Sequence, residues 1–216
     1  MIPLRDSTRS RTTPVVVYGL IAVSVAVFLH TLGLESQGSL RAIYDTYGVV
    51  PRAVSGGPGQ AWMGLVTSMF LHGSWVHLGG NMLYLWVFGD NVEDAMGHAA
   101  FLVFYLLTGT LAALAHVVTH PASATPLVGA SGAIAGVLGA YFVLYPRARI
   151  LSLVFVVFLI RLVELPASLV LLLWFVLQVF QGVAALAAPH VETVAWWAHV
   201  GGFVAGAVLV PLFVRR

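Results

Sequence analysis

The chain consists of long apolar segments separated by short breaks that are polar or rich in proline and glycine. The apolar segments are Val15–Leu34, His77–Val92, Ala99–Val118, Ser131–Tyr145, Ala167–Ala188 and Ala195–Val214. A helix needs about 20 residues of this kind to cross the hydrocarbon core of a bilayer. The pattern therefore predicts an all-α polytopic membrane protein in which six transmembrane helices occupy residues 15–214.

One apolar run does not fit this length. Ile150–Ile160 has eleven residues and is followed by Arg161, Glu164 and Pro166. Because it is too short to span, we expect residues 150–160 to form an interfacial or re-entrant segment.

Two further segments lie outside the expected spans. Residues 1–14 form a short tail before the first span. Residues 35–75 form the longest connection, and they have too little polar character for a solvated domain. In this loop, Trp62, Met63 and Phe70 indicate contact with lipid or with the helix bundle.

Composition and charge support a membrane protein and suggest its orientation. The chain is 60% hydrophobic and 8% charged, and its ten positive side chains are all arginines. With six spans, eight arginines fall on one side, and only Arg41 and Arg52 fall on the other. Arginine is concentrated on the cytoplasmic side of membrane proteins, so both termini are predicted to be cytoplasmic. Counting residues 150–160 as a seventh span would move Arg215 and Arg216 outside.

Composition also narrows the chemistry. The chain has no cysteine, which excludes a disulfide framework, a thiolate metal site and a cysteine nucleophile. The placement of the arginines follows topology and forms no patch that suggests nucleic-acid binding. The short tails are typical of a bacterial inner-membrane protein.

Two polar residues on distant segments are expected at the same depth. Ser131 precedes Arg147 by 16 residues, and His199 precedes Arg215 by 16. Each therefore lies roughly 24 Å above the inner boundary of the membrane, near the outer edge of the hydrocarbon core. Polar side chains at this depth are costly unless they are paired or face water, so they indicate function.

A third segment contributes polar groups to the same level. His77 precedes Glu93 by 16 residues, and Asn81 lies one helical turn deeper on the same face. All three helices run from outside to inside in the six-span arrangement, so their polar residues meet near the outer surface.

Ser131 has a structural and a chemical interpretation. Small residues allow helices to approach closely, and Ala198, Gly202 and Gly206 form a matching ridge beside His199. Such close packing would also bring the Ser131 hydroxyl within reach of the His199 imidazole. Histidine, whose ordinary pKa is about 6.5, is the usual base that activates a serine nucleophile.

Acyl transfer also needs hydrogen-bond donors for the oxyanion. The candidates are the Asn81 amide, the His77 imidazole and the Ser131 backbone N–H, which opens a helix and has no partner within it. Glu192 is the acid nearest to His199 in sequence, but it lies seven residues away in an expected loop. The residues therefore predict a Ser–His dyad.

The chain resembles the rhomboid intramembrane serine proteases. The resemblance lies in "GASGAIAG" around Ser131, "AHVGGFVAG" around His199 and the "HxxxxHxxxN" spacing of His72, His77 and Asn81. It implies a six-helix rhomboid-like bundle, catalysis by Ser131 and His199, and an oxyanion hole that uses Asn81 and His77. It also implies cleavage of transmembrane proteins near their outer ends, a membrane-embedded first loop and lateral substrate entry near the fifth span. No cofactor or metal is implied.

The sequence departs from the rhomboid pattern at two places. Some members carry an aromatic residue four positions after the serine that stacks on the catalytic imidazole, and here that residue is Ala135. Trp196 or Trp197 is a candidate substitute. Many members also have a Trp-Arg pair in the first external loop, where this chain has Met63-Gly64.

Three other classes compete with a protease. The nearest alternative is a non-catalytic rhomboid-like protein that binds transmembrane helices, but such a protein is expected to lack the serine or the histidine. A haem or metal protein is suggested by His72, His77 and His199, although the spacing of the first two does not suit one helical face. A transporter would place charges near the midplane, and Arg161 and Glu164 fall near the inner interface instead.

Overall fold

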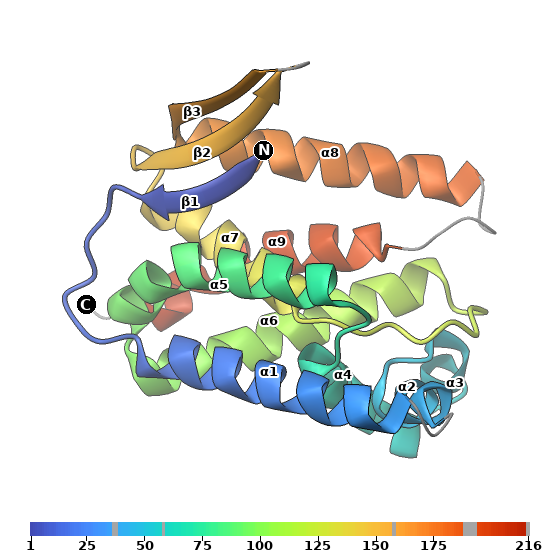
Figure 1. The fold of residues 1–216 in the computed structure, drawn as a ribbon. Helices are drawn as coiled ribbons and strands as arrows, with labels where there is room; N and C mark the ends of the chain where they lie inside the picture. The colour runs from blue at the N-terminus through green and yellow to red at the C-terminus, as the bar shows by residue number, and fades with distance from the viewer. Residues whose placement is uncertain (36–38, 58, 157–158, 188–193, 215–216) are drawn as a thin grey trace.

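A computed structural model describes residues 1–35, 39–57, 59–156, 159–187 and 194–214 of the chain (Figure 1). The described chain is mainly helical. Its long helices are α1 (Val15–Glu35), α5 (Trp75–Met96), α6 (His98–Thr119), α7 (Ser131–Leu144), α8 (Ala167–Ala187) and α9 (Trp196–Phe213). Each apolar segment expected from the sequence forms one of these helices. Ala188 lies outside the described residues.

Four of these helices are long and apolar enough to cross a membrane, namely α1, α6, α8 and α9. The other two differ for visible reasons. Helix α7 has only 14 residues, and α5 carries Asn81, Asp90 and Glu93 among its apolar side chains. The molecule is therefore a polytopic membrane protein with at least these four candidate spans in the described part of the chain.

Helix α7 lies at the centre of the bundle. Every residue from Ala133 to Tyr141 is buried, as expected of a helix that is apolar on all sides and enclosed by others. Glycines on α7 and on the neighbouring α9 allow this close packing. A side chain added at Gly202 or Gly206 of α9 would overlap the carbonyl of Gly132 or Gly136 on α7. The small-residue ridge expected from the sequence thus lies at direct backbone contact between α7 and α9.

Helix α8 lies at the edge of the bundle, where it packs mainly on α9 (Figure 1). Most of its surface is exposed, including Phe180 at 68%. Only five of its 21 residues are buried, namely Ala167, Val170, Leu171, Gln178 and Gly182. Of these five, Gln178 is the polar one.

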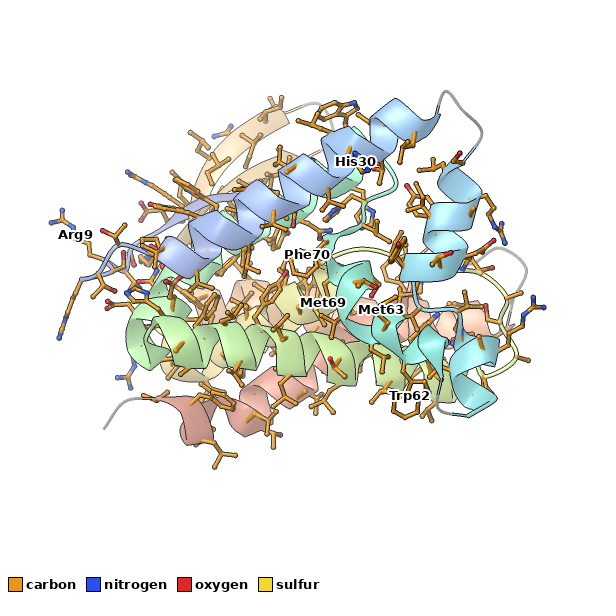
Figure 2. All side chains as sticks on the ribbon, turned by 90° about the horizontal axis from the view of Figure 1, so that it is seen from below. Arg9, His30, Trp62, Met63, Met69 and Phe70 are labelled. Atoms are coloured by element: carbon orange, nitrogen blue, oxygen red, sulfur yellow. The ribbon has the colours of Figure 1, made fainter. Side chains whose placement is uncertain are left out.

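The described residues between α1 and α5 fold into a series of short helices at one end of the bundle, which are α2 (Leu40–Tyr47), α3 (Pro51–Ser55), η1 (Gln60–Met63), α4 (Gly64–Thr67) and η2 (Ser68–Phe70). Figure 2 shows Trp62 and Met63 toward this end and Arg9 projecting from the other. Trp62 and Met63 are 45% and 42% exposed, whereas Met69 is buried against Gly109 of α6. Phe70 is partly buried against the core. The segment therefore presents apolar groups both outward and toward the helices.

A small antiparallel sheet lies near the start of α8, with strand order β1 (Ile2–Asp6), β2 (Arg149–Val156) and β3 (Leu159–Pro166) (Figure 1). It includes the run expected as an interfacial or re-entrant segment, of which residues 157–158 lie outside the described residues. The continuous apolar run shows no alternation from which strands could be recognised. Its valines and isoleucines nevertheless favour extended backbone, and Ile2 and Leu153 pair across β1 and β2.

The expected tail at residues 1–14 is also anchored to the bundle. The Tyr141 hydroxyl of α7 and the Asn91 amide of α5 both donate hydrogen bonds to the Asp6 carboxylate. Burial raises the pKa of Asp6 above its ordinary value, although the hydrogen bond from Tyr141 acts in the opposite direction. The first residues are therefore fastened to the ends of α5 and α7.

Candidate active site

A cavity of about 1210 Å³ opens between α5, α7, α8, α9 and the connection from α6 to α7. Its walls include all four side chains that the sequence singled out, Ser131, His199, Asn81 and His77. Residues far apart in the chain thus meet at one place.

Ser131 and His199 are within hydrogen-bonding distance of each other. Ser131 is the first residue of α7, and its Oγ lies 2.8 Å from Nε2 of His199 on α9. The direct packing of α7 on α9 brings the two groups together. Because Ser131 opens its helix, its backbone N–H has no partner within the helix.

Gln178 of α8 also contacts His199 and was not anticipated from the sequence. Its Oε1 lies 2.7 Å from Nδ1 of His199, on the side of the ring opposite to Ser131. Gln178 has no spacing relationship to His199 in sequence. The available signal was an amide side chain within a largely apolar helix, since buried polar groups in membrane segments are usually paired. The nearest acid in sequence, Glu192, lies outside the described residues.

Two tryptophans flank the imidazole of His199. The ring centroid of Trp174, on α8, lies 5.9 Å from that of His199, and Trp196 approaches edge-on at 6.2 Å. Trp197 instead donates a hydrogen bond to the carbonyl of Gly182. Of the two residues that the sequence suggested near the ring, Trp196 is there, and Trp174 was not anticipated. Ala135 is fully buried.

His77 lies in the first turn of α5 with a defined orientation. Ser74 caps this helix, its Oγ accepting from the His77 backbone N–H at 3.1 Å. The Gly73 backbone N–H donates to Nδ1 of His77 at 3.5 Å, which leaves Nε2 to carry the hydrogen of the neutral ring. A side chain at Gly129, which has a φ of 125°, would come within 2.7 Å of that Nε2. Glycine at this position thus lets the ring approach the chain just before Ser131.

Asn81 presents an unused donor. The residue is 8% exposed, and its Nδ2 has no hydrogen-bond partner among the described residues. An unpaired buried donor is costly. Its place in the cavity wall therefore indicates a partner that arrives from the cavity.

Other histidines lie close to this site. His72 precedes α5, and burial, together with the neighbouring His77, lowers its pKa to about 4, so its ring is neutral at pH 7. His116 and His120 line the cavity with stacked rings 4.7 Å apart. Within the described part of the chain, no three His, Asp or Glu side chains are arranged to hold a metal ion.

Most of the chain matches a known protein family. A family model for the rhomboid domain matches residues 58–216. The chain belongs to the rhomboid family. The matched range contains Asn81, Ser131, Gln178 and His199, whereas α1 and β1 precede it.

Several curated proteins are similar to this rhomboid protein. Rhomboid protein 1, mitochondrial, of Saccharomyces cerevisiae is 33% identical over 143 residues, which are 64% of this chain and 39% of the yeast protein. Rhomboid protease GluP of Bacillus subtilis is 43% identical over 79 residues, covering 37% of this chain and 15% of GluP. Presenilin-associated rhomboid-like protein, mitochondrial, of Bos taurus is 33% identical over 88 residues, covering 40% and 23%. The chain thus spans well under half the length of these relatives.

Proposed function

We propose that this rhomboid protein is an intramembrane serine endopeptidase that cleaves transmembrane proteins near the extracytoplasmic face of the membrane. The observation that carries the proposal is the 2.8 Å separation of Ser131 Oγ and His199 Nε2 within a cavity. A serine at hydrogen-bonding distance from an imidazole is the arrangement that activates the hydroxyl as a nucleophile.

In the proposed mechanism, His199 Nε2 removes the proton of Ser131 as Oγ attacks a peptide carbonyl. The tetrahedral intermediate collapses to an acyl-enzyme when His199 returns the proton to the leaving amine. Water then enters the cavity, is deprotonated by the same nitrogen and releases the second product. One imidazole therefore serves as base and acid in both halves of the reaction.

Three donors are proposed to hold the oxyanion. The Asn81 Nδ2 is buried without a hydrogen-bond partner among the described residues. The His77 ring presents Nε2–H, because its Nδ1 accepts from Gly73. The backbone N–H of Ser131 lies at the first residue of α7. Donors fixed in advance stabilise developing charge without reorganisation and are worth roughly 10²–10³ in rate each.

The same proposal includes topology. All six long helices cross the membrane, α5 and α7 being shielded by the others, and both termini lie in the cytoplasm of a bacterial cell. Residues 35–75 then form the first extracytoplasmic loop, on the side to which the cavity opens. The cytoplasmic side then holds the sheet, with Arg5 and Arg149, and the residues before α1, with Arg11. Arg215 and Arg216 lie outside the described residues.

The substrate class follows from the site. A substrate helix must be locally unwound to present a carbonyl to Ser131, and the surrounding small residues favour small side chains at the cleavage site. The partners are therefore transmembrane protein substrates and the lipid bilayer.

The test is cleavage of a model single-span substrate by purified protein in liposomes. The parent chain is compared with Ser131→Ala and His199→Ala, and circular dichroism verifies that each variant is folded. Loss of cleavage and of fluorophosphonate labelling in both variants would support the proposal. Equal cleavage by all three would trace the activity to a contaminant. An intact, unlabelled parent that still cross-links to the substrate would favour the helix-binding alternative.

A further inference from the structure

We infer that Gln178 is a positioning residue that holds His199 in the tautomer and orientation needed to activate Ser131. This inference rests on the proposed function. Its starting point is the placement of both ring nitrogens of His199, with Nε2 2.8 Å from Ser131 Oγ and Nδ1 2.7 Å from Gln178 Oε1.

Gln178 can fix the tautomer of the His199 ring. A neutral imidazole carries one hydrogen, and the nitrogen without it is the base. For Nε2 to take the proton of Ser131, the hydrogen must sit on Nδ1, which then needs an acceptor. The carbonyl oxygen of Gln178 supplies that acceptor. A ring with its hydrogen on Nε2 would donate to Ser131 and could not deprotonate it.

Gln178 can also fix the orientation of the His199 ring. Trp174 and Trp196 are about 6 Å from the ring by centroid and contribute no hydrogen bond to Nδ1. Rotation of the His199 side chain is therefore limited, among the polar contacts of the described residues, by the two hydrogen bonds at its ring nitrogens. The bond to Gln178 does not involve Ser131, so it can hold the ring while Oγ attacks the substrate.

The burial of Gln178 in α8 needs an explanation other than packing. α8 is otherwise apolar where it is buried, and most of it faces outward. A primary amide there costs free energy unless it is hydrogen-bonded. Gln178 is 7% exposed and points its oxygen at His199. Packing alone would be served as well by an apolar side chain of similar shape.

The chain offers a matched control for this residue. Gln181 lies on the same helix three positions later and is exposed. Gln178→Met keeps the length of the side chain but removes the amide acceptor, and Gln181→Met makes the same chemical change away from the site. Gln178→Glu keeps an oxygen acceptor, although it introduces an ionisable group into a buried position. Packing favours Met over Glu at position 178, whereas the proposed role favours Glu over Met.

The experiment measures kcat and KM for the model substrate and the rate of fluorophosphonate labelling in the parent and these three variants. We expect Gln178→Met to lower kcat and labelling by roughly 10- to 100-fold while KM stays within about twofold. Gln178→Glu should recover most of the loss, and Gln181→Met should match the parent. Equal rates for Gln178→Met and Gln181→Met would overturn the inference and leave the Ser131 mechanism intact.

A second measurement does not depend on catalysis. ¹⁵N NMR of histidine-labelled protein, with the His199 signal assigned by its loss in His199→Gln, reports which ring nitrogen carries the hydrogen. We expect protonated Nδ1 in the parent and a mixture of tautomers in Gln178→Met. Protonated Nε2 in the parent, or no change in the variant, would overturn the inference whether or not the protein cleaves a substrate.

Discussion

The Glu93 carboxylate of α5 accepts a hydrogen bond from the backbone N–H of Val17 at 2.8 Å. Its other oxygen accepts from Val16 at 3.0 Å. A fully buried acid thus occupies the N-terminus of α1, where free N–H groups and the helix dipole favour negative charge. His98 lies 2.6 Å from the same carboxylate. One side chain therefore joins the beginning of α1 to the junction of α5 and α6.

Replacing this carboxylate should loosen the bundle without altering the chemistry of the site. Glu93→Ala leaves one buried and one partly buried N–H group without an acceptor, and we expect it to destabilise the fold by about 2–4 kcal/mol. Asp94→Ala is the control, because Asp94 accepts from Thr12 at an exposed position. Thermal unfolding in detergent should show a clear loss for the first variant and a small one for the second. Equal losses would mean that burial of Glu93 adds nothing.

Asp6 should make stability depend on pH. Burial raises the pKa of Asp6 from 3.8 in the folded state, so the unfolded chain releases this proton at lower pH than the folded chain does. Folding is therefore favoured most below about pH 4 and is weakened as pH rises through the folded pKa. Asp6→Asn removes this dependence. We expect the stability difference between variant and parent to shift toward the variant as pH increases from 4 to 7. A constant difference would contradict the assignment.

Close packing of α7 on α9 should be essential for the distance between Ser131 and His199. A methyl group at Gly206 would overlap the Gly136 carbonyl, so Gly206→Ala must separate the helices. We expect at least a tenfold loss of fluorophosphonate labelling together with reduced thermal stability. Gly19→Ala is the control, since a side chain there meets no atom within 4 Å. Parent-like labelling of Gly206→Ala would show that the two helices can relax without cost.

Asn81 should act on the transition state more than on binding. Asn81→Ala removes a donor that has no partner within the described structure, so the fold should be as stable as the parent or more so. We expect kcat to fall roughly 10²- to 10³-fold with little change in KM. Steady-state cleavage and thermal unfolding measure the two effects. A stability loss that accounts for the lower rate would argue for a structural role instead.

The helices could be predicted from the sequence because each apolar segment is long and sharply bounded. The common location of Ser131, His199, Asn81 and His77 could also be predicted, since the charged residues that follow each segment allowed their expected depths to be compared. The structure places these groups in one cavity, and their roles in catalysis remain predictions.

Neither the contact of Gln178 nor the sheet could be predicted from the sequence. Each depends on contacts between segments far apart in the chain. The rotation of α8 about its axis decides whether Gln178 faces lipid or His199, and the nearly uniform apolar character of α8 leaves that rotation undetermined. The pairing of β2 with β1 and with β3 likewise left no alternating pattern in the sequence.

The sheet also has a consequence for biosynthesis. Strand β1 emerges early, yet the contact between Ser7 and Arg149 joins residues 142 positions apart. β2 follows α1, α5, α6 and α7 along the chain, so β1 must wait without its partner while all four are made. Completion of the sheet therefore comes after these four helices are made, and it joins β1 to the segment that leads into α8.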